Sequence, residues 1–550
     1  MSWAVVRGEP AAAQLYLDSV LAAITGGGSQ HPSDVSAGAL LFHCLRQTPD
    51  QLFMINGVTG QHFSAGEILA LSVRVARALR TRCGPAAAAA GGRILAAVNN
   101  NERSLAVYLA ALLTGLPLMV IHVGSSQYEM THYLKLGEPL TVFCDAAVKE
   151  AFLAAAAEVD SEHPTPIVAV ESEDFDQFIA GHSDDIDSFT VTPTGPDHGI
   201  LLLSTSGSTG LPKSAIYTNR GTLAQIPMTW IYYEQFPRPT RLVLVMSTPQ
   251  WTTYTMMVLG AAVYGYALLM PPPSPTYADV RHVVHTYKPT FSMLATPFTQ
   301  GLVEVCEPEH LSSFETVHML GAQITSECYA MVKEKFAPTC NICDGYGLTE
   351  TQGYVIMADP KGPRCATGKV INIFDYKLVN EDGEVVGADE EGELYIKCIS
   401  FVKGYLKNNE FQNDFKDGWL QTGDMFVQDK DGNLYYRRRI KFTFKYFSQW
   451  VSPEEVERVA STVPGVRQLV VCSSERGPAA VVVLMNDADP EQVKREIHAV
   501  VNSTLNETKQ LRGGVFVVQD AELPRTHSGK IKRAGVQQLV ASLIRRGSAA

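Results

Sequence analysis

Short apolar runs alternate with segments of helical periodicity through most of the chain, and this alternation limits the possible folds more than any other feature. Residues 91–98, 117–121 and 140–144 are apolar runs of strand length, and residues 104–114 carry apolar side chains at helical spacing. Strands separated by helices are typical of parallel sheets whose faces the helices cover. The pattern therefore predicts an α/β fold.

The pattern changes after residue 368. Three Asp-Gly pairs separate short alternating runs there, namely Asp382-Gly383, Asp417-Gly418 and Asp431-Gly432. Asp-Gly is a hairpin signal, so residues of about 368–438 are predicted to form a β-rich subdomain. We expect one large N-terminal domain over residues 1–438.

Helix and strand patterns return after residue 438. Ser452 and Pro453 have the character of an N-cap and a first helical residue, and acidic residues follow in the first turn. Residues 466–472 and 479–485 are strand candidates, and residues 490–502 are a second helix candidate. We therefore expect a small α+β domain over residues 439–550.

Charge and apolar content exclude several classes of protein. Lys and Arg number 45 against 57 Asp and Glu, which gives a net charge of −12 and disfavours binding to a phosphate backbone. The longest apolar stretch, residues 255–270, is too short for a membrane span and is predicted to be a buried helix followed by a strand. The N-terminus has no basic leader, so we expect no secretory signal and a cytoplasmic location.

The cysteines and histidines show no metal-binding framework. Ten cysteines are scattered along the chain, as expected in a reducing compartment. Cys340 and Cys343 form one C-x-x-C without a second ligand pair, so they are interpreted as buried thiols beside a strand. His282 and His285 are interpreted as ordinary helix residues.

The sharpest local feature is an apolar strand that runs into a loop rich in Gly, Ser and Thr. The loop and its flanks comprise Thr205, Ser206, Gly207, Ser208, Thr209, Gly210 and Lys213. Small residues let backbone amides approach an anion, hydroxyls add donors, and one lysine adds a point charge. The spacing is not that of a Walker A loop. Composition alone leaves a flexible surface loop equally open.

Several further motifs follow this loop in a fixed order. They are Gly321-Ala322-Gln323, the segment from Asp344 to Glu350, Thr422-Gly423-Asp424, Arg439 in a basic stretch, and the segment from Pro524 to Lys530. In this order, over residues 39–533, the chain resembles the adenylate-forming superfamily. That superfamily includes acyl- and aryl-CoA synthetases, the adenylation domains of nonribosomal peptide synthetases, and beetle luciferases.

The resemblance implies a fold and a set of site residues. The fold is α/β, with two parallel-type αβαβα sheets and the β-rich subdomain in the N-terminal domain, and a mobile C-terminal lid that carries Lys530. The implied catalytic residues are Lys530, Thr349 and Glu350. The implied ATP- and AMP-binding residues are Thr205, Ser206, Gly207, Ser208, Thr209, Gly210, Lys213, Gly321, Ala322, Gln323, Asp344, Gly345, Tyr346, Asp424 and Arg439. Glu350 and Thr209 are the expected Mg²⁺ ligands.

Each implied role has a simpler structural alternative. Tyr346 lies between two glycines, which suits a ring that stacks on adenine, but it also suits a core tyrosine in a tight turn. Asp424 can accept the ribose hydroxyls with the help of Arg439, but each residue could equally belong to a surface ion pair. In the family, the lysine at the position of Lys530 bridges the carboxylate and the α-phosphate; alone, it would be a solvated surface lysine.

The implied chemistry has two steps. A carboxylate is joined to AMP with loss of pyrophosphate, and the adenylate then meets a thiol after the small domain has rotated about a hinge. Lys441 occupies the hinge position, and Lys445, Phe447 and Ser448 lie on the expected CoA side. Ser448 stands where the family usually has glycine, so the CoA step is less certain than adenylation. The sequence ends about twenty residues after Lys530, which favours free coenzyme A over a carrier domain in the same chain.

The acid itself is left open by the sequence. Trp251, Thr252 and Tyr254 are expected to line an apolar pocket for a fatty or aromatic acid, and Thr252 falls where many CoA ligases have histidine. We therefore expect an ATP-, Mg²⁺- and CoA-dependent acid:thiol ligase of the kind found in fatty acid metabolism. The alternatives are an enzyme that loads a carrier protein, a luciferase-like oxygenase, and a non-catalytic binder of nucleotide or acyl ligands.

Overall fold

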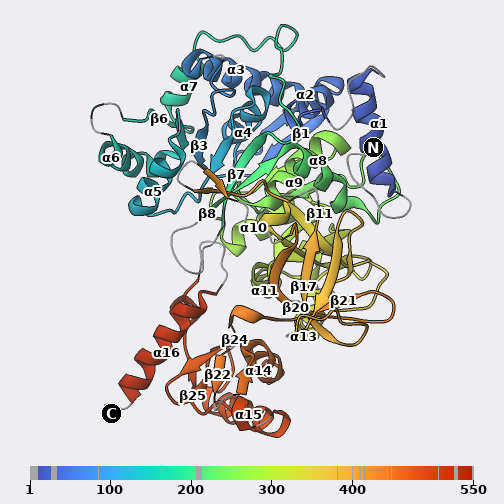
Figure 1. Ribbon diagram of the computed structural model, residues 1–550, viewed down its shortest axis with the longest axis vertical. Helices are drawn as coiled ribbons and strands as arrows, with labels where there is room; N and C mark the ends of the chain where they lie inside the picture. The colour runs from blue at the N-terminus through green and yellow to red at the C-terminus, as the bar shows by residue number, and fades with distance from the viewer. Residues whose placement is uncertain are drawn as a thin grey trace.

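The computed structural model describes residues 10–26, 34–84, 86–160, 162, 164–205, 213–380, 382–398, 401–407, 410–412, 417–442, 444–446, 449–505, 507–525 and 531–547. Figure 1 shows a large N-terminal part and a smaller C-terminal part, with α16 (Arg533–Gly547) at one end of the molecule.

A sheet of nine strands forms one half of the large part. Its order is β15-β14-β13-β12-β11-β9-β10-β1-β2. The strands are β1 (Leu52–Asn56), β2 (His62–Ser64), β9 (Leu242–Leu244), β10 (Ala267–Met270), β11 (Phe291–Ala295), β12 (Thr316–Leu320), β13 (Asn341–Leu348), β14 (Gly353–Met357) and β15 (Lys369–Val370). Its central strands are parallel, whereas β2, β14 and β15 are antiparallel to their neighbours.

A sheet of eight strands forms the other half, in the order β19-β18-β8-β7-β4-β3-β5-β6. The strands are β3 (Ile94–Ala97), β4 (Leu118–Val120), β5 (Val142–Cys144), β6 (Ile167–Ala169), β7 (Gly199–Thr205), β8 (Lys213–Thr218), β18 (Tyr405–Lys407) and β19 (Glu410–Gln412). Five neighbouring strands are parallel, and β8, β18 and β19 extend the sheet in antiparallel pairing. The predicted sheets are therefore confirmed, with antiparallel edges that the alternation did not indicate.

Helices lie between the two sheets and on their outer faces. The helices of this part are α1 (Ala12–Thr25), α2 (Ala37–Gln47), α3 (Ala65–Cys83), α4 (Glu102–Thr114), α5 (Gln127–Gly137), α6 (Lys149–Val159), α7 (Glu173–Ile179), α8 (Asn219–Gln225), α9 (Thr252–Tyr264), α10 (Tyr277–Tyr287), α11 (Thr296–Val305), α12 (Pro308–Leu311) and α13 (Ser326–Lys335). The largest apolar cluster joins α2, α3, α4 and α9 to both sheets. Two further clusters join α10, α11 and α13 to the outer face of one sheet, and α5 and α6 to that of the other. The predicted αβαβα layers are confirmed.

The apolar stretch at residues 255–270 folds as predicted. Residues of α9 from Tyr254 to Tyr264 are all buried, Gly265 ends the helix with a left-handed backbone (φ 72°), and β10 follows. Within the described residues, every helix is too short or too polar to traverse a bilayer.

The β-rich subdomain is a four-stranded antiparallel sheet of β16 (Asp375–Val379), β17 (Glu391–Lys397), β20 (Leu420–Gln428) and β21 (Leu434–Arg439). Asp431-Gly432 lies in the β20–β21 hairpin, as predicted, with Gly432 at φ 84°. Two parts of the predicted range lie elsewhere: β15 joins the nine-stranded sheet, and β18 and β19 join the eight-stranded sheet.

The smaller part has its own apolar clusters. It contains β22 (Phe444–Tyr446), β23 (Gln449–Val451), α14 (Pro453–Ala460), β24 (Val466–Ser474), β25 (Gly477–Leu484), α15 (Pro490–Thr504), β26 (Gly514–Val517) and α16. Ser452 accepts a hydrogen bond from the amide of Glu455, which confirms the predicted N-cap. Its two clusters contain only residues from 444 onward, so this part has a core of its own.

Candidate active site

Strand β13 and the short 3₁₀ helix η4 (Thr349–Thr351) carry the central predicted segment. The strand is the third from one edge of the nine-stranded sheet, between parallel β12 and antiparallel β14. Asp344, Tyr346 and Glu350 are all half-buried, so their side chains face neither bulk solvent nor a sealed core. This segment is therefore placed to meet a ligand.

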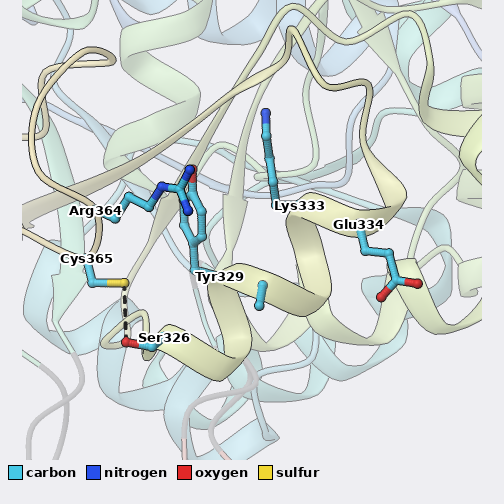
Figure 2. A pocket seen from close by; sticks show the side chains of 7 residues that line it. Ser326, Tyr329, Lys333, Glu334, Arg364 and Cys365 are labelled. Carbon is cyan, nitrogen blue, oxygen red and sulfur yellow. Dashed lines mark hydrogen bonds between the residues drawn. The ribbon is translucent and has the colours of Figure 1, made fainter.

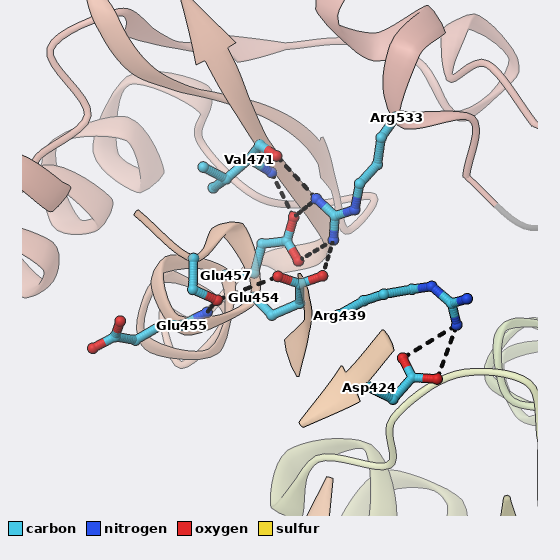
Figure 3. A network of polar contacts seen from close by, with 8 residues as sticks. Asp424, Arg439, Glu454, Glu455, Glu457, Val471 and Arg533 are labelled. Carbon is cyan, nitrogen blue, oxygen red and sulfur yellow. Dashed lines mark hydrogen bonds and ion pairs between the residues drawn. The ribbon is translucent and has the colours of Figure 1, made fainter. Parts of the chain in front are cut away.

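Tyr346, Asp424 and Arg439 form one hydrogen-bonded group. The Tyr346 hydroxyl donates to Asp424 Oδ2 at 2.8 Å, and Arg439 Nη1 donates to both Asp424 oxygens at 2.9 and 3.2 Å. Figure 3 shows the Arg439 guanidinium directed at this carboxylate. The Asp424 side chain is 2% exposed and that of Arg439 is 38% exposed. The structure thus brings together three residues that are far apart in the sequence.

The glycines on either side of Tyr346 are required by strand packing. A Cβ at Gly345 would lie 2.5 Å from the Tyr354 ring, and one at Gly347 would lie 2.2 Å from the Gly353 carbonyl oxygen. Burial and the adjacent Asp424 carboxylate raise the pKa of the Tyr346 hydroxyl well above its usual range. The phenol therefore remains a neutral donor that holds the ring in one orientation.

Asp344 is a carboxylate without a cationic partner among the described residues. Its Oδ1 accepts the Gly345 amide at 2.8 Å. Burial raises its pKa to about 7, although hydrogen bonds from Gly345 and Thr367 act in the opposite direction. Asp344 therefore titrates near neutral pH.

Gly321, Ala322 and Gln323 follow the end of β12. Gly321 and Ala322 are exposed, and Gly321 has a left-handed backbone at φ 83°. Gln323 Nε2 donates to the Tyr436 carbonyl at 3.2 Å. This bond ties the turn to β21 three residues before Arg439, the residue that pairs with Asp424. The turn and the Tyr346 group thus lie beside the same strand.

Lys213 and Glu350 meet through Tyr405, which the sequence analysis did not identify. The Tyr405 hydroxyl donates to Glu350 Oε1 at 2.5 Å, and Lys213 Nζ lies 4.7 Å from the centre of the Tyr405 ring. Burial lowers the pKa of Arg439, whereas nearby anions raise it. Asp424 has the largest raising effect, and Glu350 has a smaller one. One electrostatic neighbourhood therefore includes the loop lysine, Glu350 and the Asp424–Arg439 pair.

The phosphate-type loop joins two antiparallel strands. Thr205 at the end of β7 pairs with Lys213 at the start of β8. A strand follows the loop, whereas a helix follows a Walker A loop, so the prediction that this is not a Walker A loop is confirmed. Ser206, Gly207, Ser208, Thr209 and Gly210 lie outside the described residues, as do Phe447, Ser448 and Lys530. Lys441 and Lys445 lie in the segments before and within β22, and their side chains are not described; the roles of all these residues stay predictions.

The three predicted acyl-pocket residues have different surroundings. Trp251 is half-buried at the start of α9, and the hydroxyl of Thr252 lies 2.6 Å from that of Tyr217. Tyr254 is fully buried and its ring meets the Tyr108 ring edge-on at 5.2 Å. Trp251 and Thr252 therefore lie at the helix end nearest the site, whereas Tyr254 lies deeper, between α9 and α4.

Glu350 and its neighbours fit a magnesium ion that is carried by a nucleotide. Glu350 supplies carboxylate oxygen, and Thr349 beside it supplies a hydroxyl. Among the described residues, no group of three or more His, Cys, Asp or Glu side chains could hold a metal alone. Mg²⁺ is commonly bound by one or two carboxylates together with substrate phosphates, so a single carboxylate suits that mode.

A surface cavity of about 400 Å³ lies on α13, outside this site. Figure 2 shows Arg364 over the Tyr329 ring and Cys365 directed at Ser326, with Sγ and Oγ 3.8 Å apart. Among the described residues, none of the predicted site residues lines this cavity.

The two cysteines of the predicted C-x-x-C, Cys340 and Cys343, are buried, and burial raises the pKa of each thiol to about 12.

Comparison with protein families finds two matches along the chain. Residues 41–406 match the family described as AMP-binding enzyme. Residues 455–530 match the family described as AMP-binding enzyme C-terminal domain.

Individual relatives have several activities. A luciferin 4-monooxygenase from Nipponoluciola cruciata is 27% identical over 88% of this chain and 90% of its own length. A 3-hydroxybenzoate–CoA ligase from Aromatoleum sp. (strain CIB) is 25% identical over 89% of this chain and 94% of its own length.

Solved structures share the fold. The anthranilate CoA ligase AuaEII in complex with anthranoyl-AMP has a TM-score of 0.81 at 20% identity, over 93% of this chain and 99% of that one. ATP-bound MatB from Rhodopseudomonas palustris has a TM-score of 0.80 at 20% identity, over 93% of this chain and all of that one.

Proposed function

The chain belongs to the AMP-binding family of adenylate-forming enzymes, and we propose from this that it is an acid:CoA ligase for a fatty or aromatic carboxylic acid. The observation that carries the proposal is that four charged side chains lie in one neighbourhood, namely Lys213, Glu350, Asp424 and Arg439. Lys213 is a cation suited to phosphates, and the Asp424–Arg439 pair is suited to a ribose. A site of this kind suits a nucleoside triphosphate.

In the first step, a carboxylate oxygen of the acid attacks the α-phosphorus of ATP. A new P–O bond forms, the bond to the bridging oxygen breaks, and pyrophosphate leaves. Nucleotidyl transfer mainly needs positioning and neutralisation of charge. Lys213 and Lys530 provide positive charge, and the Asp424–Arg439 pair holds the ribose. Glu350 and Thr209 would hold Mg²⁺, which would supply further neutralisation of the phosphates.

In the second step, the CoA sulfur attacks the carbonyl carbon of the acyl-adenylate. A C–S bond forms, AMP leaves with its phosphate oxygen, and the thiol proton is lost. The C-terminal part, residues 439–550, rotates about Lys441 between the steps, so that Lys530 leaves the site and the Lys445 side approaches it. CoA is preferred to a carrier protein because relatives of this chain include ligases named for CoA, such as the 3-hydroxybenzoate–CoA ligase.

An aromatic acid is the first candidate substrate. Relatives named for 3-hydroxybenzoate and 4-hydroxybenzoate match most of this chain. Trp230, Tyr233 and Phe291 form an aromatic cluster in the core, with ring centres 5.0 and 4.7 Å from that of Trp230; Trp230 and Phe291 are each 1% exposed, so the preference for an aromatic acid depends on the relatives. Tyr233 and Trp230 follow α8, the helix whose Gln225 donates to the Thr351 and Tyr354 carbonyls beside Glu350.

The test measures acid-dependent exchange of labelled pyrophosphate into ATP for benzoates and for fatty acids, followed by loss of CoA thiol. Exchange with thiol loss supports the ligase. Exchange without thiol loss supports carrier loading or, if oxygen is consumed and light is emitted, the oxygenase. Silence in both assays supports a non-catalytic binder.

The Lys530→Ala variant tests the predicted catalytic lysine. We expect it to abolish exchange and to leave ATP binding measurable. Lys532→Ala is the matched control, because Lys532 is an exposed lysine two residues further along. Unchanged exchange in Lys530→Ala would remove this lysine from the mechanism.

A further inference from the structure

Tyr405 is held at the site by long-range strand pairing. In the register of β18 and β8, Tyr405 is opposite Ala215 and Leu406 is opposite Ser214. The Ile216 amide donates to the Gly404 carbonyl at 3.0 Å, and the Lys403 amide donates to the Ile216 carbonyl at 2.9 Å. Leu406 is 2% exposed and belongs to the core of the eight-stranded sheet. The backbone of Tyr405 is therefore fixed beside the strand that begins with Lys213.

The segment that carries Glu350 is tied to the same loop. The Val402 amide donates to the Glu350 carbonyl at 2.9 Å, and Gln352 Nε2 donates to the Phe401 carbonyl at 3.0 Å. The backbone of residues 401–405 thus bridges η4, from the nine-stranded sheet, and β8, from the eight-stranded sheet. Tyr405 lies at the junction between the two halves of the large domain.

The side chain of Tyr405 makes a different contact with each half. Its hydroxyl donates to Glu350 Oε1, and its ring lies 4.7 Å from Lys213 Nζ. A phenol can do both because it has a polar end and a negatively polarised face. Tyr405 thus contacts a cation from β8 with its ring and an anion from η4 with its hydroxyl.

We propose that Tyr405 is a positioning residue for the nucleotide step: its hydroxyl orients the Glu350 carboxylate toward the Mg²⁺ of MgATP, and its ring sets the place of the Lys213 ammonium. The inference rests on the proposed function of the site. A partner that hydrogen-bonds a metal-ligating carboxylate fixes its orientation and raises metal affinity. A cation over an aromatic face is attracted by the ring quadrupole, so the Tyr405 ring favours one place for the Lys213 ammonium.

Two substitutions separate the two contacts. Tyr405→Phe removes the hydroxyl and keeps the ring, and Tyr405→Leu removes both. The matched control is Tyr395→Phe, because Tyr395 is also a strand tyrosine whose ring contacts a lysine, Lys377, at 5.4 Å, in the antiparallel sheet of β16 and β17.

The measurement is ATP affinity by calorimetry, once in excess MgCl₂ and once in excess EDTA. For Tyr405→Phe, we expect the gain in affinity that Mg²⁺ gives to shrink by about tenfold, with unchanged affinity in EDTA. For Tyr405→Leu, affinity in EDTA should fall as well, because Lys213 loses its support. Tyr395→Phe should match the unmodified protein in both solutions.

A second measurement excludes a general structural effect. Thiolysis by CoA of a supplied synthetic acyl-adenylate needs neither Mg²⁺ nor ATP, so both Tyr405 variants should keep that rate while they lose pyrophosphate exchange. The adenylate used is that of the acid with the strongest exchange.

Three results would overturn the inference: equal loss of affinity in MgCl₂ and EDTA for Tyr405→Phe, an undiminished Mg²⁺ gain in that variant, or thiolysis that falls in step with exchange. Failure of the proposed function has a different signature, because the unmodified protein would then lack acid-dependent pyrophosphate exchange or CoA thiolysis whatever its affinity for ATP.

Discussion

Figure 3 shows two groups in which an arginine contacts carboxylates, and they differ in how many hydrogen bonds the guanidinium makes. Arg533 donates from Nη1 and Nη2 to the two oxygens of Glu457 at 2.7 and 2.8 Å, and from Nη1 to the Val471 carbonyl at 2.9 Å. Glu454 lies 3.5 Å away, and the Phe442 ring covers the guanidinium at 5.2 Å. Residues of its own domain therefore contact both terminal nitrogens of this arginine.

Arg439 makes fewer hydrogen bonds within the described residues. Within the described residues, its hydrogen bonds run from one nitrogen to Asp424, and its side chain is 38% exposed against 19% for Arg533. Burial lowers the pKa of both arginines, but the adjacent carboxylates raise each above its ordinary value. The difference indicates that the Arg533 group stabilises the C-terminal domain, and it leaves the Arg439 group accessible for the ribose that we propose it binds.

The largest effect is expected on stability, from Glu457→Ala. This change leaves Arg533 without its bidentate partner in a mostly buried position, and breaking such a pair costs about 3–5 kcal/mol. Denaturant unfolding of the full chain, followed by proteolysis to locate the opened part, measures it. Glu491→Ala is the control, because its pair with Lys494 is 69% exposed on the glutamate side and should be worth less than about 1 kcal/mol. Equal losses in the two variants would contradict the structural role of the Arg533 group.

The next effect is expected on ligand binding, from Arg439→Ala. Loss of a charged donor at the ribose should weaken ATP binding by about 2 kcal/mol, or roughly thirtyfold, with a smaller change in the free energy of unfolding. Calorimetry and thermal unfolding test the two parts. Arg438→Ala is a matched control on the same strand, because Arg438 pairs with Glu391 at 2.8 Å instead. A larger loss of stability than of ATP affinity would show that Arg439, like Arg533, mainly stabilises the fold.

Asp344 is a third carboxylate for this comparison, and among the described residues no arginine forms an ion pair with it. Its pKa rises on folding from 3.8 to about 7 through burial, so the folded state holds the proton more tightly than the unfolded chain. Stability from this group is present at low pH and is lost as pH rises from about 4 to about 7. Asp344→Asn does not ionise, so between pH 5 and pH 8 its free energy of unfolding should rise by about 2–3 kcal/mol relative to that of the unmodified protein. A difference that stays constant with pH would contradict the raised pKa.

The smallest effect is expected from a third arginine pair, which joins the two domains. Arg467 in β24 lies 3.1 Å from Glu304 in α11, and both side chains are about one-third exposed. Such a pair is worth about 0.2–1 kcal/mol and is screened by salt. Arg467→Ala should therefore change the ratio of exchange to thiolysis by less than about fivefold, and only at low ionic strength. A change that persists in high salt would show that this contact is more than a surface pair.

Local signals were enough to predict many elements. Ser452 and Pro453 mark the start of α14, Asp431-Gly432 marks a hairpin, and residues 255–270 contain a helix and a strand, as predicted. Each depends on a cap, a turn or an apolar run, which acts within a few residues of its position. The AMP-binding family was also predictable, because its motifs are short and their order is preserved.

The pairing of distant strands was not predictable in the same way. The segment with Tyr405 was predicted to belong to the β-rich subdomain, yet it pairs with β8. No local signal distinguishes Tyr405 from other strand tyrosines. The two glycines around Tyr346 indicated room for a ligand, whereas the structure shows that they admit Tyr354 and the Gly353 carbonyl.

The sequence alone determined which chemical groups this protein possesses and the order in which they occur, because residue types and short spacings are local properties. Only the tertiary structure decided which groups meet. Asp424 and Arg439 face each other across a hairpin, and Tyr405 links Lys213 to Glu350 across two sheets. Such contacts depend on strand register and on the burial of whole layers, which are set by the packed chain as a whole.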